Sequence, residues 1–238
     1  MKIHFSIKYF TQWGQNMAIV GNLPQLGAND PSKAVFMNFQ WKENWSYVVD
    51  INATEPFELN YRYLLKDNNG LDNFEWGTDR AIMVDPAAQT DLYLCDTWNN
   101  PGAIENVFMT SPFQDVLLKD NYIPVKASLK KKYTHIFRVK APLLKKGEGL
   151  CLVGNVKALG AWDGANCLPM SNENSPWWSV KVDLSKTKEE GVSYKYAIYD
   201  LEDKTFRYFE NGPDRYAPVT GDGKALTMVT DCFANFYN

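Results

Sequence analysis

An internal repeat constrains the fold of this chain more than any other feature. Residues 19–28 read I-V-G-N-L-P-Q-L-G-A, and residues 152–161 read L-V-G-N-V-K-A-L-G-A. Further pairs separated by the same 133 positions are Trp45 and Trp178, Tyr61 and Tyr194, and Tyr63 and Tyr196. Chance can produce one such match but not a co-linear series, so the chain consists of two copies of one module.

The alignment of the two copies sets the expected domain boundaries. It needs no gap from Ile19 to Trp76, which then falls on Phe209. Beyond that point the second copy has two extra residues, and the aligned pairs are Asp79 and Asp214, Arg80 and Arg215, and Asp96 and Asp231. We expect the first copy to cover residues 1–98, a linker to cover 99–130, and the second copy to cover 131–238.

Alternating apolar and polar residues predict β-strands in both copies. One inward face comprises Trp45, Tyr47, Val49 and Ile51, and its counterpart comprises Trp178, Val180, Val182 and Leu184. A second inward set comprises Phe57, Leu59, Tyr61, Tyr63 and Leu65. Short strands at regular spacing, without a long amphipathic helix, indicate an all-β chain. We therefore predict two tandem immunoglobulin-like antiparallel β-sandwich modules with Trp45 and Trp178 in their cores.

Composition excludes several classes of function. The chain has 25 Lys and Arg against 28 Asp and Glu, a net charge of −3, so we expect no nucleic-acid partner held by a basic field. No run approaches the roughly 18 apolar residues of a membrane span, so we expect no membrane partner. With 2 His and 4 Cys, none at metal-ligand spacing, we expect no metal, no cofactor and reduced, mostly buried thiols. The opening M-K-I-H-F-S-I-K-Y-F lacks the apolar core of a secretory signal, which favours a cytoplasmic location.

The second copy carries an ordered set of motifs that resembles a known family. In chain order the motifs are Val153-Gly154, Leu159-Gly160-Ala161-Trp162, Trp178, Tyr194-Lys195-Tyr196 and the run from Phe209 to Arg215. Together they resemble the starch-binding carbohydrate-binding modules of family 20. The resemblance implies a β-sandwich that binds an α-1,4-glucan or maltooligosaccharide without catalysing a reaction.

A pair of such modules resembles the N-terminal part of one enzyme group, the amylomaltase-like 4-α-glucanotransferases of the plant-cytosolic disproportionating type. Segments 94–98 and 111–116 resemble the linker of these enzymes, and residues 233–238 resemble the run that leads toward their catalytic barrel. The resemblance implies a targeting segment that is followed by a C-terminal catalytic barrel in a longer protein. It implies no catalytic residues in this segment itself.

The resemblance assigns a first sugar site to the second copy. Two aromatic side chains, Trp162 and Phe209, would stack on glucose rings beside the ammonium of Lys195. Glu210 and Asp214 would be polar partners. Core packing of Trp162 or Phe209, and a merely solvated Lys195, stay open as alternatives.

The first copy departs from this pattern, and we expect its first site to be weak. Asn29 stands at the position of Trp162, and Arg62 stands at the position of Lys195. The gapless alignment leaves Trp76 as the aromatic residue of the site.

The resemblance places a second sugar site on the first copy. Trp13 directly precedes a Gly-Gln-Asn turn, and Phe39 and Trp41 precede the core Trp45. The second copy has Lys146 and Asn172 at the positions of Trp13 and Phe39, so we expect no second site there. The alternative for Phe39 and Trp41 is a cluster that fills a loop.

The sequence leaves two other functions open. A complete small glycosidase needs two carboxylates at a set separation, and no pair stands out by context. The two histidines, His4 and His135, do not combine with other residues into a recognisable catalytic triad. A protein-interaction or interdomain scaffold with degenerate sugar sites would use the same aromatic residues as interface anchors.

Overall fold

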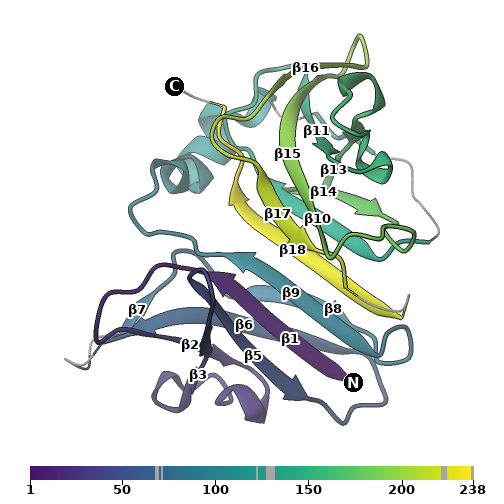
Figure 1. Ribbon diagram of the computed structural model, residues 1–238. Helices are drawn as coiled ribbons and strands as arrows, with labels where there is room; N and C mark the ends of the chain where they lie inside the picture. The colour runs from purple at the N-terminus through teal and green to yellow at the C-terminus, as the bar shows by residue number, and fades with distance from the viewer. Residues whose placement is uncertain (68–69, 71, 122, 127–131, 221–223, 237–238) are drawn as a thin grey trace. The chain divides into compact units, whose positions relative to one another are not determined.

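The computed structural model describes residues 1–67, 70, 72–121, 123–126, 132–220 and 224–236 (Figure 1). The predicted module boundary at residues 130 and 131, and the predicted end at residue 238, lie outside these ranges. The chain divides into two compact units, Met1–Ala103 (unit 1) and Ile104–Asn238 (unit 2). Residues 104–126, which fall within the predicted linker, belong to unit 2.

Among its described residues, unit 1 forms nine strands in two sheets. The strands are β1 (Lys2–Lys8), β2 (Asn16–Gly21), β3 (Val35–Phe36), β4 (Asn38–Gln40), β5 (Asn44–Asp50), β6 (Phe57–Lys66), β7 (Asp72–Phe74), β8 (Arg80–Val84) and β9 (Asp91–Thr97). One sheet has the order β9-β1-β5-β4, and the other has the order β3-β2-β6-β7 with β8 also paired to β6. Two 3-10 turns, η1 (Pro24–Leu26) and η2 (Pro31–Lys33), lie between β2 and β3.

Unit 2 repeats this arrangement strand for strand. Its strands are β10 (His135–Lys140), β11 (Glu148–Gly154), β12 (Leu168–Pro169), β13 (Ser171–Asn174), β14 (Trp177–Val182), β15 (Gly191–Asp200), β16 (Thr205–Phe209), β17 (Arg215–Pro218) and β18 (Ala225–Phe233). The sheets have the orders β13-β14-β10-β18 and β12-β11-β15-β16, with β17 also paired to β15.

Short helical turns complete unit 2. Two 3-10 turns, η6 (Lys157–Leu159) and η7 (Gly164–Asn166), match those of unit 1. Before β10 the chain forms η3 (Ile104–Met109), the π-helical turn η4 (Pro112–Leu117) and η5 (Lys119–Asn121). Within the described ranges, no helix has both the length and the apolar character needed to cross a membrane.

The all-β prediction and the β-sandwich class are confirmed. In unit 1 the two sheets meet through side chains such as Phe5 of β1 and Tyr61 of β6, whose rings lie 5.1 Å apart. In unit 2 Phe137 of β10 and Tyr194 of β15 make the same contact at 4.9 Å. Each unit also contains a parallel strand pair, β1 with β9 and β10 with β18, which the purely antiparallel prediction did not include.

The predicted inward faces are also confirmed, apart from two half-buried positions. Trp45 and Trp178 are buried, as are Val49 of β5 and Val180 and Val182 of β14. Tyr47 and Phe57 are only half-buried. The four cysteines are free thiols, but only Cys151 is buried, so the prediction of mostly buried thiols is wrong.

A buried polar network lies at the centre of unit 2. The Tyr194 and Tyr196 hydroxyls each donate to Asp231 Oδ2 at 2.8 Å. Arg215 bridges Asp231 at 2.9 Å and Glu210 at 2.7 Å. Because every member has a charged or polar partner, the network offsets the cost of removing these groups from water.

Unit 1 contains the same network. The Tyr61 and Tyr63 hydroxyls donate to Asp96 Oδ2 at 2.8 and 2.9 Å. Arg80 bridges Asp96 at 3.0 Å and Glu75 at 2.6 Å. The sequence alignment paired these tyrosines, arginines and aspartates between the copies, but it did not reveal that they contact one another.

The network perturbs the ionisation of its members. Burial and the neighbouring Asp231 carboxylate raise the pKa of Tyr194 and Tyr196 well above the usual value. Burial alone would lower the pKa of Arg215, but Asp231 and Glu210 outweigh it and the net shift is upward. The tyrosines therefore stay neutral and the arginine stays charged at physiological pH.

We predict that Arg215→Ala lowers the free energy of unfolding by about 3–5 kcal/mol, because it leaves two buried carboxylates without a counter-charge. The matched control is Arg207→Ala, which removes an exposed arginine that pairs with Asp200 and Asp203 in the same unit. Its unfolding midpoint should stay close to that of the wild type. Chemical denaturation followed by circular dichroism measures both, and equal losses would contradict the structural part assigned to the network.

We also predict that stability falls as the pH rises above about 10, the unfolded tyrosine pKa. A raised folded pKa contributes stability that is fully present below the unfolded pKa and is lost as pH rises through the folded pKa. Tyr194→Phe should make the decline of the unfolding free energy with pH less steep. An unchanged slope in denaturation measured across alkaline pH would argue against this assignment.

Candidate functional site

Unit 1 presents an open groove lined by aromatic side chains. The groove has a volume of about 490 Å³ and is lined by Thr11, Gln12, Trp13, Gly14, Gln15, Asn16, Phe39 and Trp45. Trp13 is fully exposed, and Phe39 is 60% exposed. We call this surface the unit 1 groove.

A tight turn holds Trp13 away from the sandwich. The Gln15 amide donates to the Gln12 carbonyl at 3.0 Å, and the Gln12 amide donates to Gln15 Oε1 at 2.8 Å. Gly14 has a φ of 87°, a left-handed conformation that favours glycine at this position. The turn therefore fixes the backbone on both sides of an exposed ring.

Trp45 is the floor of the groove rather than part of its open wall. Only 5% of it is exposed, and its indole Nε1 donates to the Tyr9 carbonyl at 3.2 Å. The Phe39 ring meets the Trp45 ring edge-on at 5.2 Å. Phe39 is thus fixed on one side by a core residue and open to solvent on the other.

Trp41 lies outside the groove lining. It is 84% exposed in the turn between β4 and β5, where Lys42 and Glu43 have φ values of 60° and 61°. The structure brings Trp13 and Phe39 together around one cavity, and it leaves Trp41 on a neighbouring turn.

Unit 2 presents a second aromatic surface, formed by Trp162 and Phe209. Their ring centroids lie 6.1 Å apart at an interplanar angle of 78°. Both rings pack on a small cluster of Cys151, Val153 and Ala197 on the outer face of the sheet. Both remain half-buried, so the structure combines the two sequence alternatives: part of each ring packs and part is open.

The backbone around Trp162 is held in an uncommon conformation. Ala161 and Trp162 have φ values of 52° and 60°, and the Trp162 amide donates to the Gly154 carbonyl at 2.8 Å. Non-glycine residues adopt this left-handed region rarely, and such strain is concentrated at ligand clamps and active sites. Asn29 has the same conformation in unit 1 and donates to the Gly21 carbonyl at 2.7 Å.

Lys195 lies on the outward face of β15, as predicted from its register. Its ammonium donates to the carbonyls of Gly212 at 2.6 Å and Glu210 at 3.3 Å. An ammonium has three donors, so one N–H is left for a further acceptor. Asp214 is exposed in the following turn.

Glu210 differs from the expectation of a polar ligand partner. It is 3% exposed, and its carboxylate accepts from Arg215 and from the Tyr196 amide. Because its carboxylate faces the interior, the geometry gives Glu210 a structural part in the buried network.

The structure also corrects the alignment of the aromatic residue in unit 1. Phe74 pairs with Leu64, and Phe209 pairs with Ala197, which is the repeat partner of Leu64. Phe74, not Trp76, is therefore the counterpart of Phe209. The extra residues of unit 2 lie within the β15–β16 hairpin, where the register shifts between Ile198 and Tyr199, because hairpins absorb insertions more easily than paired strands.

Trp76 occupies a different place in the fold. Its amide donates to the Asn99 carbonyl at 2.9 Å, and the Asn99 side chain donates back to the Trp76 carbonyl at 3.0 Å. In unit 2 the Asn211 amide makes the equivalent bond to the Asn235 carbonyl at 2.7 Å. The sequence could have located Phe74, since Glu75 and Arg80 have the same spacing as Glu210 and Arg215.

The surface of unit 1 that corresponds to Trp162 and Phe209 is covered by its own arginine. The Arg62 guanidinium lies 5.0 Å above the Phe74 ring and donates to the Glu75 carbonyl at 2.6 Å. With Asn29 in place of Trp162, this surface offers no second ring.

Within the described residues, no three His, Cys, Asp or Glu side chains gather as metal ligands would. The exposed parts of the rings on the two surfaces offer contact with an apolar face of a ligand, with a few polar groups at the edge.

We predict that Trp13→Ala changes the free energy of unfolding by less than about 0.5 kcal/mol, because the ring makes little contact with the fold. Trp45→Ala should lower it by about 3–5 kcal/mol, since it removes a buried ring. Chemical denaturation of the two variants compares the exposed ring of Trp13 with the buried ring of Trp45 in the same groove. A large loss for Trp13→Ala would show that this ring packs in the fold.

A family model described as "Starch binding domain" (CBM_20) matches residues 1–92 and 133–229 of the chain. The chain is 25% identical over 232 residues to 4-alpha-glucanotransferase DPE2 of Oryza sativa subsp. japonica, a match that covers 90% of this chain and 24% of the relative. It is 31% identical over 96 residues to an alpha-amylase of Streptomyces violaceus, covering 40% of this chain and 16% of the relative. The chain thus spans about a quarter or less of the length of these relatives.

A solved family 20 CBM of the maltotetraose-forming amylase from Pseudomonas saccharophila STB07 also matches. The TM-score is 0.32 at 19% identity, and the match covers 39% of this chain and 99% of that chain.

Proposed function

Because the chain belongs to the starch binding domain family, CBM_20, we propose that it binds α-1,4-glucans through two aromatic surfaces, one on each unit. The observation that carries this proposal is the unit 1 groove, in which Trp13 and Phe39 are exposed beside a buried floor residue. Large exposed aromatic rings around a cavity are costly for a soluble protein unless a ligand covers them.

The chemistry of the rings matches that of a glucan. A glucose ring has an apolar face of C–H groups and a rim of hydroxyls. Aromatic rings contact the apolar face with little loss of side-chain entropy, because they have few rotatable bonds. Polar groups such as Gln15 and Asn16 in the groove, and Lys195 beside Trp162 and Phe209, would bond the hydroxyls.

The two surfaces are different in kind. The unit 1 groove uses Trp13 and Phe39, and the unit 2 surface uses Trp162 and Phe209 with Lys195. Two rings and a few polar groups are consistent with micromolar to millimolar dissociation constants, or about −8 to −4 kcal/mol. If one glucan reaches both surfaces, the second contact is intramolecular and the avidity exceeds either affinity.

We further propose that the chain is the non-catalytic, glucan-targeting part of a cytoplasmic 4-α-glucanotransferase whose catalytic barrel follows it. The similarity to 4-alpha-glucanotransferase DPE2 along 90% of this chain supports this proposal. A binding segment that holds a glucan near the barrel would raise the local substrate concentration there.

We predict that Trp13→Ala and Trp162→Ala each weaken maltoheptaose binding at their own surface about tenfold, since a lost ring contact of roughly 1.4 kcal/mol is a factor of ten. The double variant should show no saturable binding in calorimetry at millimolar maltoheptaose. The matched control is Tyr216→Ala, which removes an exposed ring of β17 outside both surfaces and should bind like the wild type.

Absence of maltoheptaose binding by the wild-type chain would refute the glucan-binding proposal and favour an interdomain scaffold. Turnover of maltotriose by the isolated chain would refute the non-catalytic assignment.

A further inference from the structure

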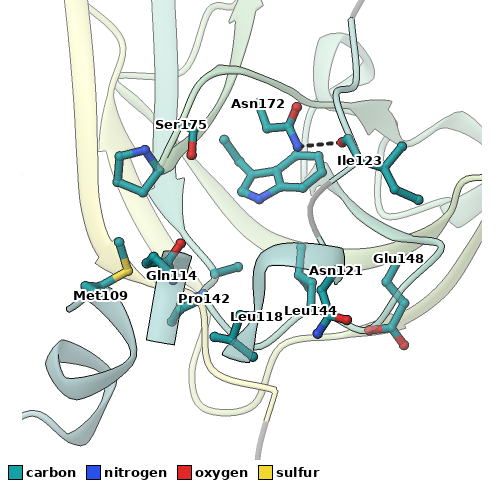
Figure 2. A pocket seen from close by; sticks show the side chains of 13 residues that line it. Met109, Gln114, Leu118, Asn121, Ile123, Pro142, Leu144, Glu148, Asn172 and Ser175 are labelled. Atoms are coloured by element: carbon teal, nitrogen blue, oxygen red, sulfur yellow. Dashed lines mark hydrogen bonds between the residues drawn. The ribbon is translucent and has the colours of Figure 1, made fainter. Parts of the chain in front are cut away.

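A cavity on unit 2 occupies the position that corresponds to the unit 1 groove. Three groove residues, Gln15, Phe39 and Trp45, have the repeat partners Glu148, Asn172 and Trp178, and all three partners line this cavity (Figure 2). Its volume is about 60 Å³, against about 490 Å³ for the groove. That space holds a few waters and is too small for a glucose ring.

The chain itself accounts for the smaller volume of the unit 2 cavity. Part of the cavity wall is formed by residues from the segment that precedes β10, namely Met109, Gln114, Leu118, Asn121 and Ile123 (Figure 2). The remaining wall residues are Ala141, Pro142, Leu144, Ser175 and Pro176. We call residues 109–121 and 123–125 the docking segment. Leu118 and Ile123 line this cavity together with Trp178, the repeat partner of Trp45.

Hydrogen bonds anchor the docking segment to β13. Asn172 Nδ2 donates to the Ile123 carbonyl at 2.9 Å, and the Val125 amide donates to Asn172 Oδ1 at 2.7 Å. The Asn172 amide and the Ser171 hydroxyl both donate to the Val125 carbonyl, at 3.2 and 2.9 Å. One side-chain amide thus satisfies a backbone donor and a backbone acceptor of the docking segment.

The residue differences between the two units fit this contact. Phe39 in unit 1 offers an exposed ring, whereas Asn172 is 2% exposed and offers a donor and an acceptor that match a peptide backbone. Lys146 replaces Trp13 and is exposed at the rim. This position has lost both stacking rings and has gained a side chain suited to bind the chain.

We infer that the second-site position of unit 2 is a docking site for the chain's own segment, anchored by Asn172, and that it is closed to glucan. Unit 2 then binds glucan at the Trp162 and Phe209 surface alone. The docking contact stands on the hydrogen bonds and the cavity, whereas the statement about glucan rests on the proposed function.

Hydrogen exchange of the full chain, followed by mass spectrometry, tests the docking contact. Asn172→Ala should speed amide exchange in peptides from residues 109–125 about tenfold, because the anchoring bonds are lost. Lys146→Ala, at the exposed rim of the same position, is the matched control and should leave their exchange unchanged. Leu118→Ala loosens the segment from its own side and should also speed exchange, which covers the case that Asn172→Ala does not fold. Unchanged exchange in Asn172→Ala and Leu118→Ala would overturn the docking contact.

The closure to glucan is tested by adding maltoheptaose to the same protein. Exchange within residues 109–125 should be the same with and without the sugar, and Trp13→Ala with Trp162→Ala should leave no saturable binding. Sugar-dependent exchange in this segment, or residual binding that disappears with Asn172→Ala, would overturn the closure. Wild-type protein that binds no sugar would refute the proposed function alone, because the exchange of the variants without sugar still decides the docking contact.

Discussion

The buried Tyr-Tyr-Asp-Arg-Glu network is the interaction on which both units depend. In each unit one arginine pairs with the glutamate in the turn before β8 or β17 and with the aspartate of the last strand. The same aspartate accepts from the two tyrosines of β6 or β15. Removing the arginine would leave buried carboxylates without a counter-charge, so the network allows one arrangement of these strands and penalises others. The hydrogen-bond and ion-pair distances of the network agree between the units to within about 0.1 Å.

A fixed interior leaves the outer surface free to diverge. The same turn that lifts Trp13 from unit 1 carries Lys146 in unit 2, and the position that carries Trp162 in unit 2 carries Asn29 in unit 1. Where a unit has lost its rings, its own side chains or backbone cover the place: Arg62 lies over Phe74, and the docking segment lies against Asn172. Each unit thus presents one of the two open aromatic surfaces described above, and the two surfaces lie at non-equivalent positions of the same fold.

The sequence predicts the sandwich class and the inward faces because burying one face of a strand requires apolar and polar residues to alternate. The repeat shows this alternation twice, once in each copy. It places Trp13 and Trp162 on exposed or half-exposed loops, because turn residues surround them, whereas Phe39, which it also places in a loop, lies in the short strand β4. It misplaces Trp76, since a gapless alignment cannot detect extra residues inside the β15–β16 hairpin. It assigns Glu210 to the surface although the carboxylate faces inward, because a motif gives no direction to a side chain. The docking segment is also missed, since its contact with β13 joins residues about 47 positions apart through backbone groups.

The central claim is that glucan binds at two non-equivalent aromatic surfaces, the unit 1 groove and the Trp162 and Phe209 surface of unit 2. A crystal structure of the chain with maltoheptaose tests it most directly. The account predicts glucose rings against Trp13 and Phe39, and against Trp162, with the docking segment still bonded to Asn172. Glucose rings bound at Phe74 and Arg62, or in the space now filled by the docking segment, with both proposed surfaces empty, would contradict it.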